Sequence, residues 1–144
     1  KQTSKFANVL QNLGIEKGER VFSLAGRIPE LYVAALGTLK YTSVFCPLFS
    51  VFGPEPIYHR LAKGEATVLL TTTALFYKKI ELLLEKLPLL RYVLISDATE
   101  HISGKILSYS KLMEQANEAF ELRIFIILLH RVKNTLKIRH ILFK

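Results

Sequence analysis

The sequence predicts an α/β fold, with a doubly wound and mainly parallel sheet flanked by helices. Short apolar runs alternate along the chain with segments of helical periodicity, and the links between them are short. The apolar runs are continuous, which is typical of strands buried on both faces. With 144 residues, half of them hydrophobic and 22% charged, the chain has the size and composition of about one globular domain.

The first elements are two helices around a short strand. A helical stripe of apolar residues predicts a helix at 1–13, and Gly14 follows as a stop signal. The apolar run 20–24 predicts the first strand. A second helix should cover 29–39, because Pro29 lacks the N–H that would be unpaired in a first turn.

The remaining elements continue the alternation and give a sheet of about four strands. In order, we expect a strand at 43–49, a helix at 53–62, a strand at 66–70, a helix at 74–87, a strand at 92–95 and a helix at 111–120. Pro88 should end the helix at 74–87, which carries a strong apolar face. Its apolar positions are Leu75, Ile80, Leu83, Leu84 and Leu87.

The stretch from Val44 to Arg60 is the most informative part of the sequence. A short apolar run ends in a turn rich in proline and glycine, and the turn leads into a segment that can form a helix. In an open α/β sheet, ligands bind at the carboxyl ends of the strands. The sequence therefore predicts a ligand-contacting turn at this junction.

Several short motifs, in order and with consistent spacing, resemble one family over roughly residues 3–121. They are Leu13 to Val21, Gly26 to Tyr32, Leu36 to Lys40, Cys46 to Phe49, Phe52 to Glu55, Arg60-Leu61, Glu65-Ala66, Leu70 to Thr72, Leu87-Pro88 and Tyr92 to Ile95. The chain resembles the beginning of the acyl-adenylate-forming enzymes, and within them the AMP-forming acetate–CoA ligases. This resemblance implies the first subdomain of their large domain.

The resemblance also implies a two-step reaction. A carboxylate attacks the α-phosphate of ATP to give acyl-AMP and pyrophosphate, and the thiol of coenzyme A then displaces AMP. The family uses ATP, magnesium and coenzyme A, and a cytoplasmic location is expected. Its phosphate loop, ribose-binding aspartate and lid lysine do not occur in this chain. We therefore expect no catalytic residue, no tight cofactor binding and no activity of the chain alone.

Four residues are candidates for the coenzyme A path. By resemblance, Phe49, Ser50 and Val51 line the pantetheine path, and Arg60 meets a phosphate of coenzyme A. Simple core and turn packing is the alternative for the first three, and a helix-surface ion pair is the alternative for Arg60.

Other polar positions have structural interpretations. Lys78 and Lys79 lie near where related enzymes place arginines for the coenzyme A nucleotide, but a solvated helix face explains them as well. Arg27 and Glu30 suit a local ion pair. Thr42 stands where the family usually has glycine, so we expect it to avoid the left-handed conformation.

Composition argues against several other classes of protein. The four histidines have no metal-ligand spacing, and the single cysteine, Cys46, cannot form an internal disulfide. We interpret it as a small buried hydrophobe, with a reactive thiol as the alternative. No signal peptide opens the sequence, and the longest apolar run, Ile124 to Leu129, is too short to cross a bilayer. We expect neither a membrane nor a nucleic acid as partner.

The basic character is concentrated in a tail. The net charge is +8, and residues 122–144 hold six Lys and Arg and no acidic residue. We divide the chain into a partial adenylate-forming domain at 1–121 and an atypical basic and apolar tail at 122–144. A frameshifted gene copy and a native basic segment both explain the tail.

Two functions of different classes follow. The first is a fragment of an AMP-forming acetate–CoA ligase, with acetate, ATP and coenzyme A as small-molecule partners. The second is a non-catalytic α/β module that binds a nucleotide or a partner. Acyl-chain specificity and oligomeric state stay open.

Deleting residues 122–144 should raise solubility and leave the melting temperature almost unchanged. The run Ile124 to Leu129 is β-prone, uncharged and free of proline, which is typical of aggregation-prone segments. Sedimentation and thermal unfolding of both forms measure this. If the shortened chain unfolds, the tail is a structural part of the domain.

Overall fold

The computed structural model describes residues 1–121, and the tail with the predictions made for it lies outside this range. The elements in order are α1 (Gln2–Asn12), β1 (Arg20–Leu24), α2 (Pro29–Lys40), β2 (Val44–Leu48), α3 (Pro54–Lys63), β3 (Ala66–Thr71), α4 (Thr73–Leu75), a π-helix (Phe76–Ile80), a 3₁₀-helix (Glu81–Lys86), β4 (Tyr92–Ile95), β5 (Ile106–Ser108) and α5 (Tyr109–Gln115). No helix within the described residues is both long enough and apolar enough to cross a membrane.

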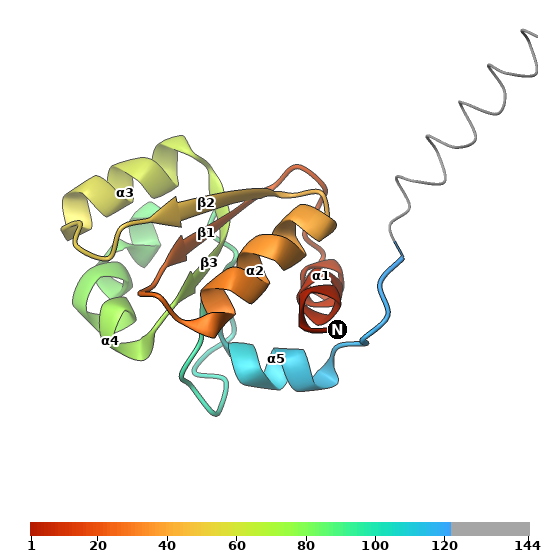
Figure 1. Ribbon diagram of the computed structural model, residues 1–144. Coiled ribbons are helices and arrows are strands. Elements are labelled where there is room, and N and C mark those ends of the chain that lie inside the picture. The colour runs from red at the N-terminus through yellow and green to blue at the C-terminus, as the bar shows by residue number, and fades with distance from the viewer. Residues whose placement is uncertain (122–144) are drawn as a thin grey trace, which may run out of the picture.

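The strands form one parallel sheet in the order β2-β1-β3-β4-β5. Helices cover both faces (Figure 1): α1, α2 and α5 lie on one face, and α3 and the segment that begins with α4 lie on the other. This confirms the predicted doubly wound α/β fold.

Alternate residues of the central strands pack into two separate cores. In β1, Val21 faces the layer of α1, while Phe22 and Leu24 face the layer of α3. The six residues of β3 are all buried. Burial on both faces explains why these strands read as continuous apolar runs.

Strand β2 forms one edge of the sheet and is protected against pairing. The N–H of Val44 donates to the carbonyl of Glu19, 2.9 Å away, so alternate N–H groups of β2 point toward β1. The backbone groups of Phe45 and Pro47 point away from β1 toward the open edge, and proline has no N–H to donate there. The outer edge is therefore a poor template for another strand.

The prediction of one regular helix at 74–87 is wrong. One turn of α-helix leads into a π-helix and then a 3₁₀-helix, and the N–H of Glu81 donates to the carbonyl of Phe76, five residues earlier. The buried apolar residues Phe76 and Ile80 are four apart, which is the spacing of a regular helix, so the apolar pattern gives no signal for the π turn.

The C-terminal part of the sheet also differs from the prediction. Strand β5 was not expected, because its three residues form no apolar run of useful length. Helix α5 occupies 109–115 instead of 111–120. The side chain of Ser108 caps its start by accepting from the N–H of Lys111, 3.3 Å away, and the extended backbone of Ala116 ends it.

Thr42 adopts the left-handed conformation, which corrects the expectation that it would avoid it. Its φ is 67°, and its carbonyl accepts from the N–H of Gly18, 2.9 Å away. Its N–H donates to the carbonyl of Leu39 at the end of α2. The chain must reverse between α2 and β2 in three residues, and these bonds hold the strained turn in place. The Thr42 hydroxyl is buried and has no hydrogen-bond partner.

Replacing Thr42 with glycine should stabilise the protein. A left-handed β-branched residue costs about 1–2 kcal/mol, and the extra freedom of glycine in the unfolded chain returns part of this, for a net gain of about 0.5–1 kcal/mol. Urea unfolding followed by circular dichroism measures the change.

A Thr42→Val variant is the matched control. It removes the unpartnered hydroxyl and keeps the β-branched side chain. If Thr42→Val stabilises as much as Thr42→Gly, the buried hydroxyl and not the backbone conformation is the source of the cost.

Candidate functional site

The candidate site is the loop 49–53, which joins the carboxyl end of β2 to α3. Strand order 2-1-3-4-5 places the switch point of the sheet beside β1, and ligands of such sheets bind at the carboxyl edge there. At the carboxyl ends of β1 and β3 the hydroxyl of Thr71 donates to the carbonyl of Leu24, 2.8 Å away. Two hollows border the β2 side of the sheet.

The first hollow lies at the carboxyl ends of β1 and β2. Its volume is about 390 Å³, and residues 25–27, Leu31 and residues 47–50 line it. Two of the predicted site residues, Phe49 and Ser50, therefore form part of its wall.

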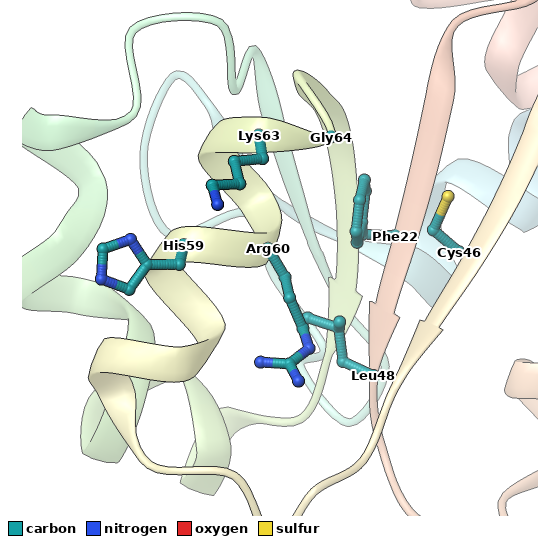
Figure 2. A pocket seen from close by; sticks show the side chains of 7 residues that line it. All are labelled: Phe22, Cys46, Leu48, His59, Arg60, Lys63 and Gly64. Carbon is teal, nitrogen blue, oxygen red and sulfur yellow. The ribbon is translucent and has the colours of Figure 1, made fainter.

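The second hollow lies between β2 and α3 and has a volume of about 550 Å³. Figure 2 shows three basic side chains on α3 and an apolar floor from β1 and β2. The basic residues are His59, Arg60 and Lys63, and the floor residues are Phe22, Cys46 and Leu48. Apolar and cationic groups thus meet in one groove, and loop 49–53 connects the two elements that border it.

Two of the three predicted pantetheine-path residues are strongly exposed. Phe49 is 72% exposed and Val51 is 84% exposed, whereas Ser50 is half-buried. Core packing therefore does not explain Phe49 and Val51. The ring of Phe49 packs edge-on against Phe52, with 5.7 Å between the ring centroids.

Arg60 does not form the helix-surface ion pair that was the alternative for it; no carboxylate pairs with it within residues 1–121. Its guanidinium lies over the ring of Phe52, 4.2 Å from the centroid, and Nη1 donates to the carbonyl of Pro56, 3.0 Å away. This cation–π contact couples α3 to loop 49–53. Sequence reasoning missed the role of Phe52, which looked like part of a turn.

Lys79 also contacts the loop, which the expectation of a solvated helix face missed. Its ammonium donates to the carbonyls of Ser50 and Phe52, at 2.5 and 2.7 Å. Its neighbour Lys78 is exposed, which agrees with the expectation of a solvated face. A lysine that binds backbone carbonyls 27 and 29 residues away leaves no pattern in the sequence.

Two smaller expectations have mixed outcomes. Cys46 is partly buried and packs against the core on the α3 face. Burial raises the pKa of its thiol, although Arg20 acts in the opposite direction, so the thiol stays protonated at neutral pH. In the described part of the chain, Arg27 and Glu30 form no ion pair.

Asp97 anchors the neighbouring part of the carboxyl edge. Its carboxylate accepts from the N–H and the hydroxyl of Thr73, at 2.7 and 2.9 Å. Burial acts to raise the pKa of Asp97, but these hydrogen bonds and one from its own N–H outweigh burial and hold the pKa below the ordinary 3.8. Asp97 therefore ties the end of β4 to the start of α4.

Residues 1–121 bring no three His, Cys, Asp or Glu side chains together where they could hold a metal ion. The cationic groove and the apolar loop fit an organic anion better than a cation.

Asp97 should make the unfolding free energy depend on pH in acid. Because its pKa is depressed by folding, its contribution is present above 3.8, its pKa in the unfolded chain, and is lost as the pH falls through its folded value. Asp97→Asn should therefore flatten the acid limb of the stability profile, measured by urea unfolding between about pH 6 and pH 2.5.

The matched control is Glu114→Gln, which changes an exposed carboxylate that makes no hydrogen bond or ion pair within the described residues. An acid limb as steep in Asp97→Asn as in Glu114→Gln would contradict the assignment.

Comparisons with known proteins agree on one family. The model of the AMP-binding enzyme family matches residues 1–133. The chain is 31% identical over 122 residues to acetyl-coenzyme A synthetase of Bacillus subtilis. The aligned region covers 84% of this chain and 21% of that relative. It is 37% identical over 70 residues to the acetyl-coenzyme A synthetase of Alcanivorax borkumensis. This match covers 49% of this chain and 11% of that relative.

Solved structures show the same fold. An acyl-CoA synthetase of Brucella canis superimposes with a TM-score of 0.72 at 24% identity, over 84% of this chain and 22% of that one. A benzoate CoA ligase from Burkholderia xenovorans superimposes with a TM-score of 0.72 at 21% identity. The match covers 84% of this chain and 23% of that one. The chain thus spans about a fifth of the length of these proteins, and over that length it belongs to the AMP-binding family of adenylate-forming enzymes.

Proposed function

We propose that the chain supplies the first part of the large domain of an AMP-forming acetate–CoA ligase. The overall reaction converts acetate, ATP and coenzyme A into acetyl-CoA, AMP and pyrophosphate. The observation that carries this proposal is the position of loop 49–53. The loop lies at the carboxyl edge of a parallel sheet of the AMP-binding family, between two hollows, and it exposes apolar side chains.

The loop fits a segment of the coenzyme A path. The pantetheine arm alternates methylene and amide groups, so exposed apolar side chains and backbone carbonyls suit it better than a charged surface does. Phe49 and Val51 offer the apolar contacts, and Ser50 adds a hydroxyl. The Arg60 guanidinium, which no carboxylate of the described residues neutralises, is available to a phosphate.

Acetate is the proposed acyl group because the two relatives above are both named acetyl-coenzyme A synthetase. Magnesium would be held through the ATP phosphates, since residues 1–121 supply no set of ligands for it. We place the reaction in the cytoplasm, with small-molecule substrates and neither nucleic acid nor membrane as a partner.

The isolated chain should not form acyl-AMP. Phosphoryl chemistry depends on fixed groups that stabilise charge on the phosphates, and the sequence contains no Gly-x-Gly or Ser-Gly-Thr run that could form a phosphate loop. In a pyrophosphate-exchange assay with acetate, ATP and magnesium, we expect only background rates. Exchange above background would overturn the proposal that this segment is a scaffold without catalytic groups.

A chimera tests the positive half of the proposal. Residues 1–121 replace the matching segment of the Bacillus subtilis acetyl-coenzyme A synthetase, and acetyl-CoA formation is measured against coenzyme A concentration. A working chimera whose KM for coenzyme A rises several-fold in Arg60→Met, with little change in kcat, supports the coenzyme A path. A folded but inactive chimera, together with tight nucleotide binding by the isolated chain, would instead favour a non-catalytic binding module.

A further inference from the structure

We propose that Lys79 is the positioning residue of loop 49–53, holding the backbone that aims Phe49 and Val51 at the coenzyme A path. The inference rests on the proposed function for its ligand, but its structural basis is independent of it. Lys79 belongs to the π-helix, far from the loop in sequence.

The contacts of the Lys79 ammonium enclose the loop. Nζ donates to the carbonyl of Ser50, 2.5 Å away, and to that of Phe52, 2.7 Å away. The same turn is closed by the N–H of Phe52, which donates to the carbonyl of Phe49, 3.1 Å away. Two carbonyls that are two residues apart thus converge on one cation, and the turn curls around it. Hydrogen bonds from a charged donor are stronger than those from a neutral one.

The π-helix gives Lys79 its direction. Phe76 and Ile80, at the two ends of the π-helix, are 1% and 0% exposed, so the segment is anchored in the core. A π turn holds more residues than an α turn, and the side chains within it are rotated relative to those of a regular helix. Lys79 is half-buried beside this anchor, whereas Lys78 is exposed.

The charge of Lys79 is committed to the loop. Within residues 1–121 no carboxylate forms an ion pair with it. Arg60 adds a second cation, stacked 4.2 Å from the ring centroid of Phe52. Two cations therefore hold the loop. Lys79 of the π-helix binds the backbone of the loop, and Arg60 of α3 binds the side chain of Phe52.

Phe49 and Val51 depend on this backbone support. They are 72% and 84% exposed, so their own packing does little to fix their directions. Their placement follows from the shape of the turn, and that shape depends on the bonds that Lys79 makes.

The first experiment compares Lys79→Met with Lys78→Met in the full 144-residue chain. Methionine keeps an unbranched apolar stem and removes the ammonium, and Lys78 is the adjacent control without these bonds. Amide hydrogen exchange, followed by NMR, should be about tenfold faster at Phe52 in Lys79→Met, which corresponds to the loss of about one charged hydrogen bond. Exchange at Phe52 should be unchanged in Lys78→Met, and exchange in β1 and β3 should be unchanged in both.

The second experiment reads the site itself. Coenzyme A is titrated into the labelled chain, and amide shifts at residues 49–52 are followed. Lys79→Met should need a several-fold higher coenzyme A concentration for the same shifts, and Lys79→Arg, which keeps a cationic donor, should recover most of the response. A merely structural loss of stability would not be confined to these residues.

Unchanged exchange at Phe52 in a folded Lys79→Met variant would overturn the proposal. If that variant does not fold, NOEs in the wild-type chain between the Lys79 ε protons and the α protons of Ser50 and Phe52 decide: their presence supports the role and their absence overturns it. A third outcome separates the two proposals. If exchange at Phe52 is faster in Lys79→Met but the wild-type chain shows no amide shifts with coenzyme A, the positioning role is supported and the proposed function is contradicted.

Discussion

The parallel pairing of β1 with both β2 and β3 is the constraint on which the rest of the structure depends. The chain leaves β1 in one direction to form β2 and must then cross back over β1 to form β3. Crossovers of one hand that run in opposite directions place their helices on opposite faces of the sheet. This is why α2 and α3 lie on different faces, why β1 is buried on both, and why the chain passes the carboxyl edge at loop 49–53 (Figure 1).

The same geometry explains how an exposed loop comes to have a defined shape. Arg60 on α3 reaches the ring of Phe52, and Lys79 on the π-helix reaches the backbone on the same face of the sheet. Cations are suited to this task, because they can bind a ring face or carbonyl oxygens without a carboxylate partner. The two helices thus support both the sheet and the candidate site.

The sequence was sufficient for the elements that bury a continuous apolar run and insufficient for the rest. Strands β1 to β4 were predicted within about two residues, whereas β5, which has only three residues, was missed. The π-helix was predicted as regular helix because its buried residues Phe76 and Ile80 have the spacing of a regular helix. Resemblance gave Phe49, Ser50 and Val51 as candidates for the site. The contacts of Lys79 join it to backbone carbonyls 29 and 27 residues away, and the stacking of Arg60 on Phe52 depends on how the loop folds onto α3, so the sequence pattern encodes neither.

The position of β1 between β2 and β3 can be tested directly by NOEs in the labelled full chain. The register pairs Phe22 with Cys46 on one side and with Leu69 on the other. Backbone NOEs from the strand around Phe22 to both partners, and none between β2 and β3, are expected. Direct NOEs between β2 and β3 would show a different strand order, and with it the switch point and the placement of loop 49–53 would be lost.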